Sequence, residues 1–137
     1  MKGVFVDTQF FVAISAPHDS WHKLAVEAQR NLHAEKFVTT DEVLGEFLTA
    51  YSMLGDYWRH LAVRTAQHIL ENKRIHVVAQ SREGFLDTLS FYSQRPDKQY
   101  SFVDCRSMIV MRSEGIHAVL TNDHHFEQEG FQLLMSR

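Results

Sequence analysis

Residues 3–8 read Gly-Val-Phe-Val-Asp-Thr, a short apolar run that ends at a carboxylate. A second run, residues 118–123, reads Ala-Val-Leu-Thr-Asn-Asp and ends in the same way. Short apolar runs bounded by polar residues are typical of buried strands in a parallel sheet. Ligand sites of such sheets lie beyond the carboxyl ends of the strands. We therefore expect Asp7 and Asp123 to lie close together at one edge of a sheet.

Segments of strand and helix character alternate along the chain. Strand-like apolar runs occur at residues 4–6, 37–38, 75–78, 118–121 and 131–135. Polar caps and the helical spacing of apolar residues predict helices at residues 20–32, 41–51, 56–72, 81–92 and 101–114, and short ones at 10–14 and 124–128. Strands that alternate with helices pair in parallel. We therefore expect an α/β fold, a three-layer α/β/α sandwich around a mostly parallel five-stranded sheet.

The composition is that of an ordinary globular domain. The chain has 137 residues, of which 45% are hydrophobic and 23% charged, and its net charge is -3. No apolar run approaches the ~18 residues that cross a membrane, and residues 1–5 lack the long apolar region of a signal peptide. The single cysteine, Cys105, excludes an internal disulfide and fits a small buried hydrophobe. We expect one cytoplasmic domain, residues 1–137, with no membrane association.

Two more carboxylates, Glu46 and Asp104, lie early in expected helices that leave the same edge of the sheet, and both have apolar neighbours. Four carboxylates in one crevice repel one another, because two like charges at ~4 Å cost about 4 kcal/mol at an effective dielectric near 20. A divalent cation would neutralise them, and carboxylates and water are the ligands that Mg²⁺ and Mn²⁺ prefer. We therefore predict a site for Mg²⁺ (or Mn²⁺) formed by Asp7, Glu46, Asp104 and Asp123.

Each of these carboxylates also has a purely structural explanation. Asp104 stands three residues after Ser101, where it could return a hydrogen bond in a helix cap. Asp7 and Asp123 could each cap a short helix, and Glu46 could face solvent. The apolar neighbours of Glu46 and Asp104, and the convergence of all four residues, favour a shared site.

The nine histidines do not show the spacing of a zinc site. His18 and His22 are four residues apart, which fits a polar helix face better than a metal pair. His124 and His125 directly follow Asp123, but adjacent residues on a helix point apart. We therefore do not expect a histidine in the site.

Other classes of α/β protein are excluded because the chain lacks residues that they require. The chain has no glycine-rich phosphate loop of either common type, which excludes the usual nucleotide-binding classes. Phosphatases of the haloacid-dehalogenase type need a second aspartate two residues after the first, and Gln9 stands there. A receiver domain needs an aspartate after the third strand, where this chain has Ala79-Gln80-Ser81.

Four segments resemble, in order and spacing, the motifs of PIN domains, and most closely those of VapC-like toxins of type II toxin–antitoxin systems. They are Val6-Asp7-Thr8, Thr40-Asp41-Glu42-Val43-Leu44-Gly45-Glu46, Ser101-Phe102-Val103-Asp104 and Leu120-Thr121-Asn122-Asp123. The resemblance runs from Val4 to about Phe131. It implies a Mg²⁺- or Mn²⁺-dependent endoribonuclease that cleaves single-stranded RNA, with the four carboxylates as metal-site residues. Glu42, in the same motif, competes with Glu46 for the second position.

The resemblance also suggests supporting roles for other residues. The hydroxyls of Thr8, Ser101 and Thr121 match positions that orient carboxylates or water. Near Asp104, the candidates for contact with RNA are Arg95, Lys98, Tyr100 and Arg106, with solvated charge as the alternative for each. VapC-like toxins form homodimers and bind a small antitoxin protein. The aromatic stretch 47–58 could present a groove for it, with Tyr57 and Trp58 as the best candidates, or could be core.

Two other functions fit the same resemblance. A PIN-like module could bind RNA or a protein partner without cleaving it. Alternatively, a PIN nuclease could act in RNA processing with no antitoxin.

Overall fold

The computed structural model describes residues 2–135, and within them five strands form a single parallel sheet. The strands are β1 (Gly3–Val6), β2 (Lys36–Thr40), β3 (Ile75–Val78), β4 (Ala118–Leu120) and β5 (Gln132–Leu133). Their order across the sheet is β3-β2-β1-β4-β5, and every pairing is parallel. The expected fold class is confirmed.

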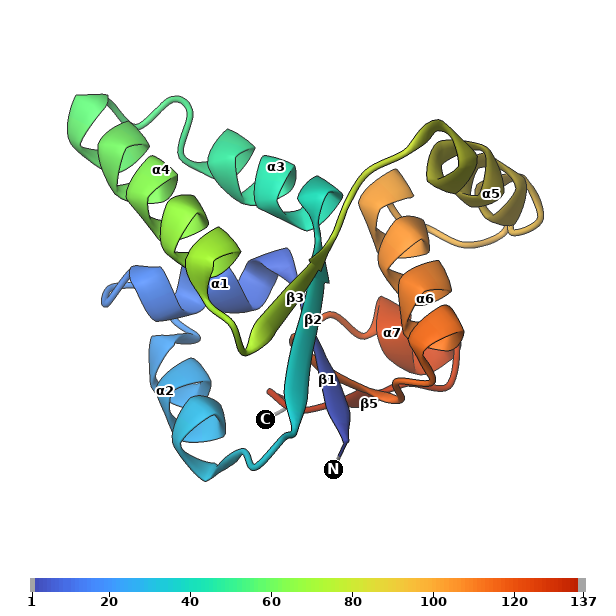
Figure 1. The fold of residues 1–137 in the computed structure, drawn as a ribbon, viewed down its shortest axis with the longest axis horizontal. Coiled ribbons are helices and arrows are strands. Elements are labelled where there is room, and N and C mark those ends of the chain that lie inside the picture. The colour runs from blue at the N-terminus through green and yellow to red at the C-terminus, as the bar shows by residue number, and fades with distance from the viewer. Residues whose placement is uncertain (1, 136–137) are drawn as a thin grey trace.

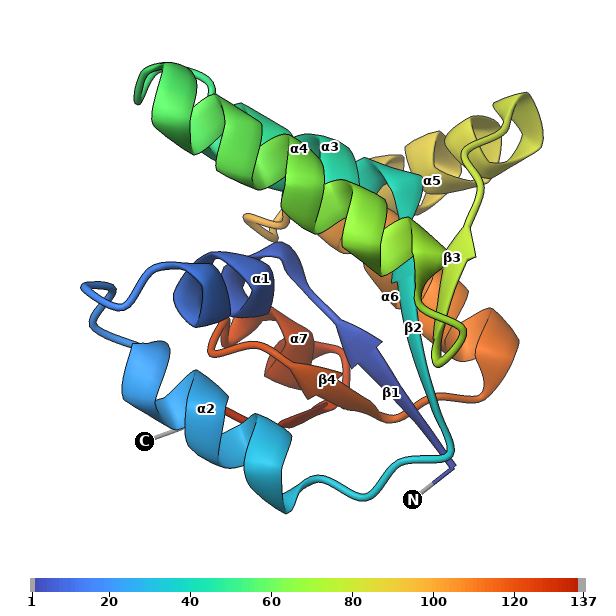
Figure 2. The ribbon, with the colours of Figure 1, turned by 60° about the vertical axis from the view of Figure 1, so that its left-hand side comes forward.

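Helices cover both faces of this sheet (Figures 1 and 2). In the described residues they are α1 (Thr8–Ser15), α2 (His22–Asn31), α3 (Asp41–Ala50), α4 (Asp56–Glu71), α5 (Arg82–Ser93), α6 (Phe102–Glu114) and α7 (His125–Gln128). Helices α1, α2 and α4 lie on one side of the sheet and α6 and α7 on the other, with α5 packed against α6 (Figure 1). Helices α3 and α4 form a hairpin at the carboxyl edge of the sheet (Figure 2).

Strands β1 and β4, at the centre of the sheet, are buried on both faces, which explains their apolar sequence. Val4, Phe5, Val38 and Val119 have no exposed surface. Phe47 of α3 is equally buried and belongs to the same core. Burying a side chain of this size stabilises the fold by roughly 1.5–3 kcal/mol.

Helix α6 begins and ends where its sequence predicts. The Ser101 hydroxyl accepts a hydrogen bond from the Asp104 amide, and the Asp104 carboxylate accepts one from the Ser101 amide, both at 3.0 Å. This is a capping box. Gly115 ends the helix with φ 68°, a left-handed conformation that favours glycine.

Helix α3 begins with a side-chain cap but without the full capping box that opens α6. Thr40 is the N-cap, and its hydroxyl accepts a hydrogen bond from the Val43 amide at 3.0 Å. The third helical residue is therefore Val43, whose side chain cannot return the bond, and Glu42 lies one position too early. This cap satisfies only one of the orphan amides of the helix.

Several boundaries differ from the sequence prediction, and those of α2 and β5 show why. Helix α2 begins at His22, because the Asp19 carboxylate accepts a hydrogen bond from the Trp21 amide (2.8 Å) in a turn before the helix. The last strand contains only Gln132–Leu133, although Phe131 and Met135 are buried beside it. Apolar burial in this segment therefore extends beyond the hydrogen-bonded ladder.

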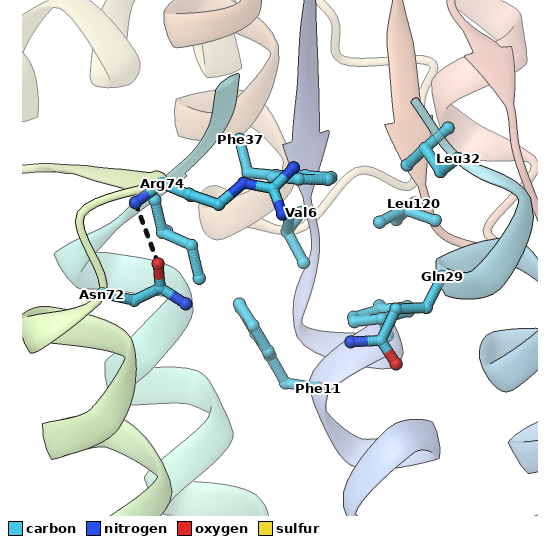
Figure 3. Close-up of a pocket in the computed structure, with 10 residues that line it drawn as sticks. Val6, Phe11, Gln29, Leu32, Phe37, Asn72, Arg74 and Leu120 are labelled. Carbon is cyan, nitrogen blue, oxygen red and sulfur yellow. Dashed lines mark hydrogen bonds between the residues drawn. The ribbon is translucent and has the colours of Figure 1, made fainter. Parts of the chain in front are cut away.

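An apolar cavity of about 180 Å³ lies beside α1 and the sheet face that α2 covers (Figure 3). Phe11, Phe37 and Leu120 are among its lining residues, and the Arg74 guanidinium lies 5.7 Å from the centre of the Phe37 ring. None of the described residues that line it is acidic, so it offers no carboxylate to a cation. Among residues 2–135, no helix is long and apolar enough to cross a membrane.

Candidate metal centre

An open pocket of about 490 Å³ lies at the carboxyl edge of the sheet. It is lined by Asp7, Thr8, Gln9, Glu46, Ala50, Gln99, Ser101, Asp104, Asn122, Asp123 and His125. The structure thus brings all four predicted carboxylates together, from segments almost 120 positions apart in sequence.

The topology accounts for this convergence. Strands β1 and β4 are neighbours, with Val6 opposite Leu120, so the aspartates that follow them share one edge. The ladder continues one step further, because the Asp7 amide donates to the Leu120 carbonyl at 3.3 Å. Helix α3 supplies Glu46 from its second turn, and helix α6 supplies Asp104 from its first turn.

Asp7 is the most buried of the four carboxylates, with 4% of its surface exposed. Its Oδ2 accepts a hydrogen bond from the Thr121 hydroxyl at 2.9 Å. Burial, reinforced by the charges of Asp104 and Glu46, raises the pKa of Asp7 to about 7, against the lowering effect of the Thr121 hydrogen bond. Its charged form is therefore costly until a cation compensates it.

Asp104 combines the two roles weighed for it in the sequence. Its carboxylate closes the capping box of α6 and also lines the pocket. Burial raises the pKa of Asp104, and the charge of Asp123 adds to that increase, while the hydrogen bond from the Ser101 amide opposes it. The cap therefore fixes a carboxylate that still faces the pocket.

The structure separates the two glutamates of α3. The Thr8 hydroxyl donates to Glu46 Oε1 at 2.5 Å, and Glu46 lines the acidic pocket. Burial is the main cause that raises the pKa of Glu46. Glu42 instead forms an ion pair with the buried Arg106 (Oε2 to Nε, 3.3 Å) and lines a different pocket beside Ser81. Glu46, and not Glu42, lies among the other carboxylates.

Asp123 and His125 occupy the turn that follows β4. The Asp123 amide donates to the Thr121 hydroxyl at 3.2 Å, and the His125 amide donates to Asp123 Oδ1 at 2.9 Å. The His125 ring then lies against two carboxylates, with Nδ1 3.2 Å from Asp123 Oδ1 and 3.5 Å from Asp104 Oδ2. One ligand atom from each of Asp104, Asp123 and His125 lies within 4.8 Å of the others.

The expectation that no histidine lies in the site is therefore wrong. His124 and His125 do point apart, as adjacent helical residues must. His124 is exposed and pairs with Glu127. His125, in contrast, lines the pocket. The signal available in the sequence was that His125 stands two residues after Asp123, at the start of a helix one turn long.

Three of the four candidates for contact with RNA have internal partners instead. Arg95 forms two hydrogen bonds of 3.0 Å with Glu129, and the Tyr100 hydroxyl donates to the same carboxylate at 2.9 Å. Arg106 is buried in the ion pair described above. Lys98 is exposed and is the candidate that stays a prediction.

The donor set of the pocket suits a hard divalent cation. Carboxylate oxygens crowd together and raise one another's pKa, which is the electrostatic cost that a bound cation would remove. Mg²⁺ and Mn²⁺ take oxygen ligands and keep room for water and phosphate oxygens, as an open pocket allows. Such a centre could activate water and neutralise a phosphate.

Comparison with known proteins finds relatives that are similar over nearly the whole chain. The 23S rRNA-specific endonuclease VapC20 of Mycobacterium tuberculosis (strain CDC 1551 / Oshkosh) is 32% identical to this chain over 134 residues, covering 93% of this chain and 95% of that protein. The crystal structure of M. tuberculosis VapC20, described as a sarcin–ricin loop cleaving toxin, superposes with a TM-score of 0.84 at 27% identity, over 93% of this chain and 95% of the other.

More distant structures share the fold. FitAcB from Neisseria gonorrhoeae superposes with a TM-score of 0.63 at 14% identity, over 95% of each chain. The family model described as PIN domain matches residues 4–131. This chain therefore belongs to the PIN domain family.

Proposed function

We propose that this chain is a divalent-metal-dependent endoribonuclease that acts as the toxin of a toxin–antitoxin pair, with residues 1–137 forming one nuclease domain. The observation that carries the proposal is the pocket in which Asp7, Glu46, Asp104 and Asp123 converge. The similarity to an rRNA endonuclease over 93% of the chain supports the choice of RNA as substrate.

The carboxylates would hold Mg²⁺ or Mn²⁺ at the centre of the pocket. When bound, the cation lowers the pKa of an attacking water and neutralises charge on the phosphate. Asp7, Asp104 and Asp123 would bind it, and Thr121 holds Asp7 in position through its hydroxyl. These residues therefore supply the negative charge and the fixed geometry of the site.

Glu46, beside the other metal-site carboxylates, would also take part in proton transfer. Thr8 donates to its Oε1, so Oε2 would be the oxygen that accepts a proton from the attacking water. The water oxygen would then form a bond to the RNA phosphorus, and the phosphodiester bond to the leaving oxygen would break in line with it. The leaving oxygen would take its proton from solvent. Burial, which raises the pKa of Glu46, makes it a better proton acceptor than an exposed glutamate.

An antitoxin would dock on the tip of the hairpin formed by α3 and α4. This tip carries Met53, Leu54 and Tyr57 with 93%, 55% and 70% of their surfaces exposed. Trp58 is half-buried and stacks on Tyr51, with ring centroids 5.8 Å apart. The tip therefore combines a rigid aromatic base with exposed apolar side chains, as a peptide groove requires.

A homodimer would use the opposite side of the molecule. Helix α5 exposes Phe85, Leu86, Leu89 and Tyr92, each between 40% and 54%. Their spacing places them on neighbouring positions of one helix face. Figure 1 shows α5 and the hairpin tip at opposite sides of the fold, so both partners could bind at once.

Cleavage of labelled RNA in EDTA, Mg²⁺ or Mn²⁺ tests the proposed function. Suitable substrates are an unstructured single strand and a 23S rRNA fragment that contains the sarcin–ricin loop. We expect cleavage of RNA with either cation, none in EDTA, and at least a roughly 100-fold lower rate for Asp7→Asn, because removal of one catalytic group typically costs this much.

The same assay separates the other functions. RNA binding without cleavage by the wild-type protein, in any cation, would favour a binding module. Cleavage together with no effect on cell growth when the protein is expressed alone would favour an RNA-processing nuclease without an antitoxin. Equal rates for wild type and Asp7→Asn would contradict the proposed site.

A further inference from the structure

We infer that His125 is a nitrogen ligand of the bound cation, beside Asp104 and Asp123, and that it biases the site toward Mn²⁺ over Mg²⁺. The inference rests on the proposed function, because it concerns the same pocket. It assigns a role to a side chain outside the four carboxylates predicted from the sequence.

The distances suit ligands of one ion. In octahedral coordination with bonds of about 2.1 Å, neighbouring ligand atoms lie roughly 3 Å apart. The His125 Nδ1 lies 3.2 Å from Asp123 Oδ1 and 3.5 Å from Asp104 Oδ2. Small adjustments would bring all three atoms to neighbouring positions in the coordination shell of one ion.

The state of the His125 Nδ1 atom is the second observation. It is buried and has no hydrogen-bond partner among the described residues, although two carboxylate oxygens lie nearby. Leaving a buried nitrogen without a partner is unfavourable. With its proton on Nε2, the imidazole presents a lone pair at Nδ1, and a cation between the three groups would satisfy it.

The surroundings of His125 hold the ring in this orientation. Its amide bonds to Asp123 Oδ1, so both ligands share one turn of backbone. Tyr100 packs edge-on against the imidazole, with centroids 5.6 Å apart, and its hydroxyl is fixed by Glu129. Supporting contacts of this kind orient metal ligands.

A nitrogen ligand changes which cation is preferred. Mg²⁺ favours oxygen ligands, whereas imidazole suits transition ions. With the nitrogen of His125 added to the aspartate oxygens, Mn²⁺ should bind more tightly than Mg²⁺. Loss of the imidazole should reduce this preference.

Pulsed electron paramagnetic resonance of the Mn²⁺-loaded protein tests the inference without measuring activity. We expect coupling of the manganese electron spin to one ¹⁴N nucleus in the wild type and its absence in His125→Ala. Calorimetry should show Mn²⁺ affinity reduced at least about 10-fold by His125→Ala, and Mg²⁺ affinity reduced less. His124→Ala is the matched control, because His124 is exposed and points away from the pocket.

The outcomes separate the two proposals. Mn²⁺ binding without ¹⁴N coupling in the wild type overturns the role of His125 and leaves the carboxylate site standing. No Mn²⁺ binding to the wild type overturns the proposed metal centre itself. Circular dichroism establishes whether His125→Ala is folded. Equal changes in Mn²⁺ and Mg²⁺ affinity in the folded variant would also overturn the inference.

Discussion

The charge of Asp7 opposes folding when no cation is bound. Its pKa is about 7 in the folded protein and near 3.8 when unperturbed, so between these values the folded state binds more protons. The contribution of Asp7 to the free energy of unfolding is most favourable below pH 3.8 and is lost as pH rises through 7. A shift of this size corresponds to at most about 4 kcal/mol.

Asp7→Asn should therefore stabilise the metal-free protein at alkaline pH. Asparagine has no charge and can still accept the hydrogen bond from Thr121. In EDTA we expect a gain of roughly 1–3 kcal/mol at pH 8, which shrinks toward pH 4. Denaturation by urea at both pH values measures it. A loss of stability at pH 8 would mean that Asp7 holds the fold together through its charge.

Glu46→Gln and Glu42→Gln should have opposite effects. Glu46→Gln should lower the RNA cleavage rate about 100-fold and leave stability nearly unchanged, because it removes a group that handles the proton. Glu42→Gln should keep most of the cleavage but lose about 1–3 kcal/mol, because Arg106 then lacks its counterion. Cleavage rates and urea denaturation measure both. The reverse pattern would assign the second carboxylate to Glu42.

Residues that follow a strand or open a helix could be placed from the sequence. Asp7, Asp123 and Asp104 occupy such positions, and the structure brings them into one pocket with Glu46. His125 could not be placed in this way, because its orientation depends on a helix of one turn.

The partners of the charged residues near Asp104 could not be predicted from the sequence. Arg95 and Arg106 resemble surface cations in the sequence, but each has a carboxylate partner far along the chain. Gly84 lets the Arg106 guanidinium approach to within 2.9 Å of where a Cβ would lie. Contacts of this kind depend on how segments far apart in the chain pack together, which local sequence does not specify.

Among the elements, α6 connects fold and site most directly. Its capping box stabilises the helix and fixes Asp104 at the same time. Helix α5 has a similar cap, in which the Ser81 hydroxyl accepts from the Gly84 amide at 3.0 Å, but Ser81 does not line the acidic pocket. The two serines therefore form a matched pair for experiment.

Ser101→Ala and Ser81→Ala should each cost about 1 kcal/mol, because each removes one helix cap. Only Ser101→Ala should also slow RNA cleavage, since Asp104 loses part of what orients it. Thermal denaturation and initial cleavage rates of both variants measure these effects. Equal cleavage by the two variants would show that the cap of α6 serves stability alone.

The positions of most strands and helices could be predicted from the spacing of apolar residues. Their boundaries could be predicted less well. Strand β3 was predicted with both ends correct, because Ile75–Val78 lies between Arg74 and the short Ala79-Gln80-Ser81 segment. Strand β5 was predicted too long, since Phe131 and Met135 are buried without joining the ladder. Periodicity reports burial, whereas strand boundaries depend on which backbone groups find partners.

At the scale of the whole molecule, alternation of strands and helices predicted the layers but not the order of the strands. The order β3-β2-β1-β4-β5 places β1 and β4 side by side, and the pocket exists because of that pairing. Such an order depends on packing between distant segments, which one sequence does not reveal.

The exposed apolar face of α5 predicts that the protein forms a dimer through this helix. Leu86→Glu combined with Leu89→Glu would place two charges on this face, and we expect the dimer to become a monomer. Leu70→Glu is the control, because Leu70 is equally exposed but lies on α4. Light scattering after gel filtration gives the mass. An unchanged mass for the double variant would exclude this face as the dimer interface.

The central claim is that the acidic pocket cleaves RNA with a bound divalent cation. The single-turnover cleavage rate of wild type and Asp104→Asn, measured as Mn²⁺ or Mg²⁺ is added to metal-free protein, tests it most directly. We predict a wild-type rate that rises from zero and saturates, and a rate at least about 100-fold lower for folded Asp104→Asn at every cation concentration. Cleavage that persists without cation, or equally in Asp104→Asn, would contradict the claim.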